Sequence, residues 1–228
     1  MPDCLYILCG GKGARLGAIT KNVPKPLIKI NGEPFISSLI RAYAERFDSI
    51  VLLAGYKGRD FLKLEDEKIK VVIESEPRGT GGALTAIWNE LPDSFFICNG
   101  DTFLYPLEIG PFLDMCAKKG ESAILISKDE KKARGSVKVE LGRAVDFEEK
   151  AGEGEGHAYT GFAFLKKSDL APWKDKTALS LEKDVFPILA KEGKLLAQIT
   201  NSRIHDIGTA AGIRKFKVLV LGTELEKG

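Results

Sequence analysis

Short apolar runs and amphipathic segments alternate through the first half of the chain. Each apolar run is too short for a core helix, which is typical of a buried strand. The expected strands are residues 4–9, 50–54, 69–73 and 95–98. Residues 34–47 and 80–91 carry apolar positions at helical spacing, and a short helix is expected around 61–65. This alternation predicts an α/β fold, with a Rossmann-like, mostly parallel sheet that has helices on both faces.

The second half of the chain is richer in strand patterns. Its expected strands, separated by turn residues, are 121–127, 135–140, 144–149 and 157–166. Ser180 precedes an amphipathic stretch, which predicts a helix that is capped by Ser180 and ends at Gly193. Residues 195–200 and 202–208 predict a final hairpin.

Length and charge narrow the class of protein. A chain of 228 residues suits one domain, so a single domain over residues 1–228 is expected. The net charge of +2 is small and does not indicate a basic surface that would bind nucleic acid. No apolar run reaches the roughly 18 residues of a membrane-spanning helix, and the N-terminus lacks the pattern of a signal peptide. We therefore expect a cytoplasmic protein that binds neither nucleic acid nor membrane, with a homodimer left open.

The four cysteines give no sign of a metal or redox site. Cys4, Cys9, Cys98 and Cys116 show no C-x-x-C spacing, and three of them lie in apolar strand-like runs. Zinc sites need closely spaced ligands, which this chain does not offer. We interpret the cysteines as small buried apolar residues in a reducing compartment.

The segment after the first expected strand has the composition of a phosphate-binding loop. Gly10, Gly11 and Gly13 follow the strand directly, Arg15 comes two residues later, and Lys25 stands between two prolines. Glycines let a ligand approach the backbone N–H groups closely, and nearby cations neutralise phosphates. We therefore expect this loop to bind a nucleotide.

The glycine loop has three alternative interpretations. A P-loop needs Ser or Thr after the Gly-Lys pair, but Gly13 follows Lys12. A dinucleotide fingerprint needs a third glycine where Leu16 stands, and Gly17 comes one residue late. A glycine-rich turn without function is the third alternative, and the two nearby cations make it less favoured.

Polar segments follow three of the expected strands. They are the glycine loop, residues 74–82 and residues 99–101. In open α/β sheets, ligands bind beyond the carboxyl ends of the strands. We expect these segments to line one crevice.

GGKGARL followed by PKPL resembles the signature of the sugar-nucleotide pyrophosphorylases, which join a sugar 1-phosphate to a nucleoside triphosphate. Ala14 stands where that family usually has Thr. EPRGTGGAL, NGDTF, SLEKDVFP and HDIGT extend the resemblance over residues 4 to about 217. Within the family, these motifs are most similar to those of the D-glycero-D-manno-heptose 1-phosphate guanylyltransferases. They also resemble those of the mannose and N-acetylmuramate 1-phosphate nucleotidyltransferases.

The resemblance implies a role for each matching position. Arg15, Lys25 and Asp101 would be catalytic. The nucleotide would be bound by Leu8, Gly10, Gly11, Gly13, Glu74, Gly79, Thr80, Gly81, Asn99 and Gly100. The sugar phosphate would be bound by Glu149, Lys150, Thr160 and Gly161. Tyr159 and Thr160 depart from the N-x-G that relatives often carry, which leaves the sugar open. The halves would be nucleotide-binding (about 1–105) and β-rich, sugar-binding (about 106–217).

Asp101 and Asp206 resemble the two magnesium ligands of the family. The chemistry favours such a site, because a triphosphate and a sugar phosphate carry more negative charge than two side-chain cations cancel. Mg²⁺ takes one or two carboxylates and completes its shell with phosphate oxygens and water. We expect Mg²⁺ as the cofactor.

Glu74 is the residue that bears on the base. A carboxylate only accepts hydrogen bonds, and guanine offers two donors on one edge where uracil and thymine offer one. The alternative is a solvated charge at a strand end. We expect GTP, with uridylyl or thymidylyl transfer as the alternative.

Two other functions remain open. One is a regulatory protein that binds a sugar nucleotide without turnover, although the presence of Arg15, Lys25 and Asp101 disfavours it. The other is a glycosyltransferase with a similar sheet and a metal-binding aspartate. Release of pyrophosphate distinguishes a nucleotidyltransferase from both.

Overall fold

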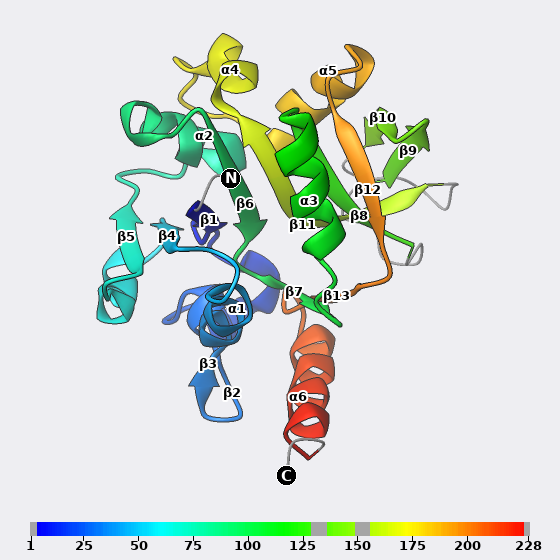
Figure 1. The fold of residues 1–228 in the computed structure, drawn as a ribbon. Helices are drawn as coiled ribbons and strands as arrows, with labels where there is room; N and C mark the ends of the chain where they lie inside the picture. Colours follow the sequence, from blue (N-terminus) through cyan, green and yellow to red (C-terminus); the bar gives the residue numbers. More distant parts are fainter. Residues whose placement is uncertain (1–3, 129–135, 149–155, 226–228) are drawn as a thin grey trace.

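The computed structural model describes residues 4–128, 136–148 and 156–225. A nine-stranded sheet in the order β5-β4-β1-β6-β11-β8-β12-β10-β9 forms its centre (Figure 1). The strands are β1 Cys4–Leu8, β4 Ser49–Ala54, β5 Ile69–Ile73, β6 Ser94–Asn99, β8 Ala123–Ser127, β9 Ser136–Glu140, β10 Arg143–Glu148, β11 His157–Lys166 and β12 Leu196–Thr200. The α/β class predicted from the alternating pattern is confirmed.

The strands of the first half form the parallel part of the sheet. β5, β4, β1 and β6 are neighbours, and each pair is parallel. Their carboxyl ends therefore meet at one edge, as the sequence predicts for the segments that follow them.

The strands of the second half extend the same sheet. β11 lies between β6 and β8 and is antiparallel to both, with Phe162 opposite Cys98. β12 is parallel to β8, while β9 and β10 are antiparallel neighbours at the far edge. The register of β11 against β8 shifts between Tyr159 and Ala163, so the strand carries an irregularity there.

The predicted final hairpin is wrong. β12 pairs with β8 on one side and β10 on the other, so neither edge is free for the next strand. The following strand, β13 (Arg203–Asp206), instead pairs antiparallel with β7 (Thr102–Tyr105), which comes directly after β6. Ser202 at the crossing point is fully buried, and its carbonyl accepts a hydrogen bond from the hydroxyl of Ser127.

Helices connect the strands and cover the sheet. They are α1 Phe35–Tyr43, α2 Gly79–Ala86, α3 Gly110–Lys119, α4 Lys167–Leu170, α5 Phe186–Lys191 and α6 Ala210–Leu225. Short 3-10 helices span Ala14–Thr20, Lys25–Leu27, Gly58–Leu64, Trp88–Glu90 and Ala171–Trp173, and β2 (Lys29–Ile30) and β3 (Glu33–Pro34) form a small hairpin. The predicted cap is confirmed: the hydroxyl of Ser180 accepts from the Lys183 N–H at 3.3 Å, at the start of a π-helical turn, Leu181–Val185.

Helices cover the sheet (Figure 1), and the buried side chains form two separate apolar cores. On one face α1 and α3 pack around the rings of Phe96, Phe112 and Phe162, and α6 joins the same core through Phe216. On the other, α2 and α5 pack around Leu84 and Phe186. Full burial of such a side chain stabilises the fold by about 1.5–3 kcal/mol. Within the described ranges, no helix has both the length and the apolar character needed to cross a bilayer.

α6 extends away from the sheet beside the β2–β3 hairpin (Figure 1). Phe216 anchors it, since its ring is 1% exposed and lies 4.8 Å, centroid to centroid, from that of Phe35 in α1. The sequence pattern did not predict this helix. The first turn of α6 follows β13 closely in the chain, so it lies near the carboxyl edge of the sheet.

Candidate active site

A cleft of about 1390 Å³ opens at the carboxyl edge of the parallel strands. It is larger than the roughly 300–1,000 Å³ of a site for one small ligand, so it has room for two substrates. Most of the predicted site residues line it, namely Leu8, Gly10, Gly11, Arg15, Glu74, Gly79, Thr80, Asn99, Asp101, Thr160, Gly161 and Asp206. The three polar segments expected in one crevice do meet.

The glycine loop makes one wall. A Cβ on Gly10 would lie 2.5 Å from Oε2 of Glu74, and a Cβ on Gly55 would lie 2.8 Å from Cα of Gly10. Glycine at both positions therefore lets the loop after β1 pass directly over the end of β5. Lys12 and Arg15 line the cleft beside it and supply positive charge.

Gly13 shapes the loop and is not among the residues on the cleft wall. It has φ +64, and a Cβ there would lie 2.9 Å from Thr20 Cγ2 and 3.3 Å from Lys25 Cβ. The Thr20 hydroxyl donates to the Gly13 carbonyl at 3.0 Å. Gly13 thus allows the loop to fold onto Lys25, which is an indirect role compared with the nucleotide contact expected from the sequence.

Lys25 and Asp101 form a short ion pair. The Lys25 ammonium lies 2.5 Å from Asp101 Oδ2, and the side chains are 7% and 23% exposed. The other carboxylate oxygen of Asp101 accepts from the hydroxyl of Thr102 at 3.0 Å. Lys25 is thus held behind the wall of the cleft and reaches it through Asp101, which lines it.

Asp101 and Asp206 are brought together by the β7–β13 pairing. Asp206 is opposite Thr102, and the N–H of Ile207 donates to the Asp101 carbonyl at 3.1 Å. Both aspartates line the cleft, and Asp206 Oδ1 also accepts from the N–H of Gly208. Two carboxylates on one wall of a cleft fit the oxygen ligands that Mg²⁺ takes from proteins. The described residues hold no group of three or more acidic, His or Cys side chains for a metal, so the remaining ligands would come from substrate and water.

Glu74 is one of the residues that line the cleft. It directly follows β5, and its N–H donates to the Ala54 carbonyl at 2.8 Å. Burial raises the pKa of its carboxyl, and the charge of Arg78 acts in the opposite direction. Its Oε1 is buried and accepts no hydrogen bond from any residue that the structure describes. A buried carboxylate oxygen without a donor is costly, so the carboxyl of Glu74 lies in the cleft wall with acceptor capacity that the described residues do not use.

The N–H groups in the glycine-rich first turn of α2 are partly used within the protein. The N–H groups of Gly81 and Gly82 donate to the Leu179 carbonyl at 2.9 and 3.1 Å. A Cβ on Gly81 would lie 2.7 Å from the Leu179 side chain. These two N–H groups are therefore not free for a nucleotide, and Gly81, which was expected to contact the nucleotide, has a packing role. Gly79, with φ +79, and Thr80 remain on the cleft wall.

Three more of the predicted residues, Gly100, Gly161 and Thr160, shape the backbone around the cleft. The Gly100 N–H donates to the Leu8 carbonyl at 3.0 Å, so Gly100 joins β1 to β6 and does not line the cleft. Gly161 has φ +82, and a Cβ there would lie 2.8 Å from Asn99 Nδ2. The hydroxyl of Thr160 donates to the Leu125 carbonyl at 2.8 Å and accepts from Phe162 N–H, which holds the bulge of β11.

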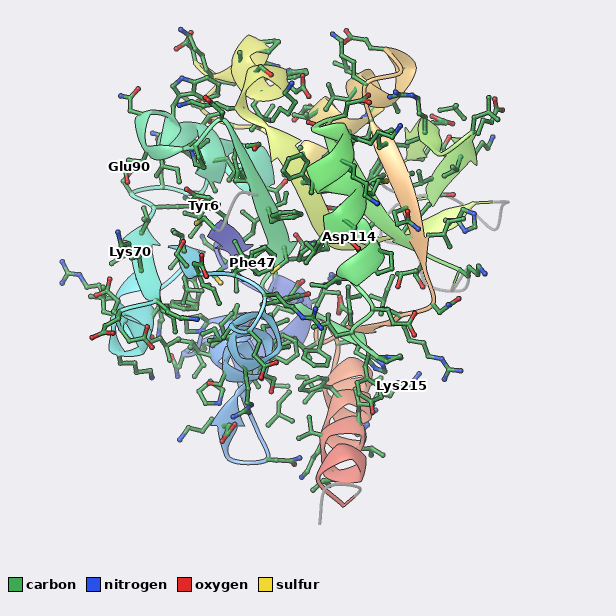
Figure 2. All side chains as sticks on the ribbon, in the orientation of Figure 1. Tyr6, Phe47, Lys70, Glu90, Asp114 and Lys215 are labelled. Carbon is green, nitrogen blue, oxygen red and sulfur yellow. The ribbon has the colours of Figure 1, made fainter. Side chains whose placement is uncertain are left out.

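Two predicted residues, Glu149 and Lys150, lie outside the described residues. The cleft also contains residues to which the sequence analysis gave no part in binding or catalysis. They include Lys12, Ser180, Glu182, His205 and Lys215. Lys215 comes from the end of α6 nearest the sheet (Figure 2). Lys12 within GGKG and His205 beside Asp206 could have been found from their neighbours, but Glu182 and Lys215 enter only through tertiary packing.

Comparisons with known proteins place the chain in a family. A family model described as "Nucleotidyl transferase" matches residues 6–221. The D-glycero-alpha-D-manno-heptose 1-phosphate guanylyltransferase of Campylobacter jejuni is 32% identical over 171 residues, which are 71% of this chain and 75% of the relative. Mannose-1-phosphate guanylyltransferase 1 of Arabidopsis thaliana is 32% identical over 219 residues, which are 89% of this chain and 60% of the relative.

A solved structure is similar over nearly the whole chain. HddC from Yersinia pseudotuberculosis, complexed with GMP-PN, has a TM-score of 0.79 and 26% identity, and the match covers 93% of this chain and 96% of HddC. The chain spans between 32% and 60% of the length of several other curated relatives. The family model, however, covers most of the present chain together with the glycine loop, Asp101 and Asp206. The chain belongs to the nucleotidyl transferase family.

Proposed function

We propose that the protein is a sugar-1-phosphate guanylyltransferase. A phosphate oxygen of the sugar 1-phosphate attacks the α-phosphorus of GTP, the bond to the β-phosphate oxygen breaks, and pyrophosphate leaves. The observation that carries the proposal is the cleft in which the glycine loop, the Lys25–Asp101 pair and Asp206 meet. No proton needs to be removed from the nucleophile, because a sugar phosphate is already anionic at neutral pH.

Catalysis would rest on position and charge. Arg15 and Lys12 lie beside the glycine loop, where they would offset the charge of the phosphates. Lys25 is nearly buried at the end of Asp101, so it is positioned before substrate arrives. Glu149 and Lys150, which follow the last described residue of β10, are proposed to bind the sugar phosphate on the basis of the family resemblance. Thr160 and Gly161 would shape the sugar end of the cleft from β11.

Mg²⁺ is the proposed cofactor, and Asp101 and Asp206 would hold it. Bound there, the ion would neutralise phosphate oxygens and align the triphosphate. Asp101 is paired with Lys25 in this structure, and its carboxylate is partly exposed to the cleft. This exposure leaves the carboxylate accessible to a cation that arrives with substrate.

GTP is the proposed nucleotide. Glu74 offers a buried acceptor oxygen to the two donors of guanine, and relatives named for guanylyl transfer match this chain. Uracil or thymine would leave part of this acceptor capacity unused. The sugar is taken from the same relatives as one of the manno series, heptose or mannose.

The proposed function extends to the division of the chain, its compartment and its oligomeric state. The nucleotide half would be about 1–105 and the sugar half about 106–217, both belonging to one domain. The described cysteines are free, which suits a reducing compartment such as the cytoplasm. A homodimer is still a prediction.

The test is a pyrophosphate-release screen with GTP, UTP, dTTP, CTP and ATP against mannose, glucose and heptose 1-phosphates. Wild type should prefer GTP over the other triphosphates by about one to two decades in kcat/KM, since one charged hydrogen-bond pair is worth roughly 1.5–3 kcal/mol. Glu74→Gln should reduce that preference. Equal or better use of UTP or dTTP would refute guanine selection but not nucleotidyl transfer. Binding without pyrophosphate release would favour the regulatory alternative.

A further inference from the structure

Glu182 lies in the cleft at the junction of two elements from different halves of the chain. It belongs to the π-helical turn Leu181–Val185, and it contacts the first turn of α2 through Thr80. Its Oε2 accepts from the Thr80 hydroxyl at 2.6 Å and from the Ser180 hydroxyl at 3.0 Å. Two short hydrogen bonds fix the orientation of the carboxylate.

The backbone around Glu182 is held as firmly as its side chain. The Leu179 N–H donates to the Arg78 carbonyl at 2.9 Å, and the Leu181 N–H donates to the Thr80 hydroxyl at 2.9 Å. The Ser180 N–H donates to Asp184 Oδ2 at 2.7 Å. Glu182 is therefore a rigidly held group and not a flexible surface charge.

The second oxygen of Glu182 is available to a ligand. Across the described ranges, no residue donates a hydrogen bond to Oε1, and no cation pairs with the carboxylate. Glu182 is thus an oriented, charged acceptor on the cleft wall, and one of its two carboxylate oxygens has no hydrogen-bond donor among the described residues. A carboxylate accepts and cannot donate, so the ligand group it suits is a hydroxyl or an N–H.

Charge and position favour the sugar over the rest of the substrates. Phosphates would be repelled by a carboxylate, and the cations Lys12 and Arg15 lie on the glycine loop instead. The proposed base acceptor Glu74 follows β5, and its carboxylate lies against Gly10 and Gly55. Glu182 instead lies near Tyr159 on β11, whose pKa is raised by burial and, secondarily, by the charge of Glu182. Tyr159 directly precedes the bulge that carries Thr160 and Gly161.

We infer that Glu182 is a specificity-determining residue that accepts a hydrogen bond from a ring hydroxyl of the sugar 1-phosphate. This inference rests on the proposed function for the identity of the substrate. Thr80 and Ser180 act as positioning residues, because they hold Oε2 so that Oε1 faces the ring. The selected sugars carry a hydroxyl at that position, and sugars that lack it bind weakly.

The experiment compares wild type with Glu182→Gln, using mannose 1-phosphate and its monodeoxy analogues. Direct binding is measured by calorimetry, and KM values for both substrates are measured by pyrophosphate release. In E182Q, KM and Kd for mannose 1-phosphate should rise about 10- to 100-fold, while KM for GTP should change less than about twofold. One deoxy analogue should bind wild type and E182Q equally, and thereby identify the hydroxyl.

Glu192→Gln is the matched control. Glu192 directly follows α5, its side chain is 49% exposed, and it pairs with Lys194 away from the cleft. E192Q should behave as wild type in every assay. If E182Q does not fold, as judged by its melting transition, Glu182→Asp takes its place, because it keeps the charge with a shorter reach and should also weaken sugar affinity.

The inference fails if E182Q binds mannose 1-phosphate as wild type does, or if both substrates are weakened alike. It also fails if every deoxy analogue distinguishes the two proteins, since that pattern indicates a general change in structure. Failure of wild type to bind mannose 1-phosphate would overturn it too. Binding of mannose 1-phosphate by wild type without pyrophosphate release would instead refute the proposed reaction, while the calorimetric comparison would still decide the role of Glu182.

Discussion

Lys25 is the residue on which the proposed chemistry depends most. Its ammonium is nearly buried and paired with Asp101 at 2.5 Å, so it is in place before substrate binds. We expect Lys25→Ala to reduce kcat by about 10²–10³, the usual loss when a preorganised electrostatic group is removed. Steady-state pyrophosphate release measures this loss. Lys29→Ala, at an exposed position of β2, should keep wild-type activity. Near-normal kcat in Lys25→Ala would make Lys25 a structural lysine only.

The ionised carboxylate of Glu74 should lower the stability of the folded protein at neutral pH. Burial raises the pKa of its carboxyl in the folded protein above the value of 4.5 that it has when exposed. The folded state therefore favours the protonated form, and this contribution is lost as pH rises through the folded pKa. Glu74→Gln, which cannot ionise, should raise the melting temperature at pH 7 relative to wild type.

The gain from Glu74→Gln should shrink as pH falls from the raised folded pKa towards 4.5, and it should be absent below 4.5, where Glu74 is protonated in the folded and the unfolded state. Thermal melts between pH 4 and pH 8 measure it. Glu67→Gln, at an exposed position, is the control and should follow wild type. A melting temperature of Glu74→Gln that is unchanged at every pH would contradict a desolvated carboxylate at this position.

At this scale the sequence was most informative where a side chain directly follows a strand. Asp101 and Glu74 could be predicted because parallel strands bring their carboxyl ends to one edge. Glu182 could not, since its place in the cleft depends on hydrogen bonds to Thr80 from a segment about 100 positions away. Gly81 was assigned to the nucleotide because nothing in the sequence shows that Leu179 covers it.

The β7–β13 pair is the element that joins the two aspartates. Asp101 precedes β7 and Asp206 ends β13, and the two strands are antiparallel neighbours. Asp101→Asn and Asp206→Asn should each raise the Mg²⁺ concentration that gives half-maximal activity, because each removes one anionic ligand. Magnesium titrations of pyrophosphate release measure the shift.

Asp114→Asn provides the control for these two variants. Asp114 is exposed on α3, and Figure 2 labels it there. Its titration should coincide with that of wild type. If Asp101→Asn and Asp206→Asn also coincide with wild type, the two-aspartate site is refuted.

Elements with a clear period could be predicted from the sequence, whereas pairing between distant segments could not. The first-half strands and the Ser180 cap have local signatures, so the pattern located them. The expected hairpin failed because β13 finds its partner in β7, almost 100 residues earlier. α6 was missed because its apolar residues lie all around the helix, so it lacks one clear apolar face.

For the whole molecule, the sheet joins both halves of the chain. β6 from the first half and β11 from the second pair over residues 94–98 and 162–166, and both apolar cores include residues from each half. We therefore expect one cooperative unfolding transition. The two tryptophans, Trp88 and Trp173, report on different halves.

Fluorescence of Trp88→Phe and Trp173→Phe during urea unfolding tests this expectation. Each variant keeps one tryptophan, and the two midpoints should agree with each other and with circular dichroism of the same variant. Separate midpoints in the two variants, each differing from its own circular dichroism curve, would show that the halves unfold independently and would argue against a single domain.

The Lys25–Asp101 pair has a consequence for thermodynamic linkage. An ammonium and a divalent cation compete for one carboxylate, so the free protein should bind Mg²⁺ weakly. Phosphates attract the same ammonium and would draw it from Asp101, so triphosphate and Mg²⁺ should each increase the affinity for the other by an equal factor. Calorimetry of Mg²⁺ binding with and without a non-hydrolysable triphosphate measures this factor, which should be smaller in Lys25→Ala. The buried lysine would then ensure that the protein acquires its metal together with its nucleotide.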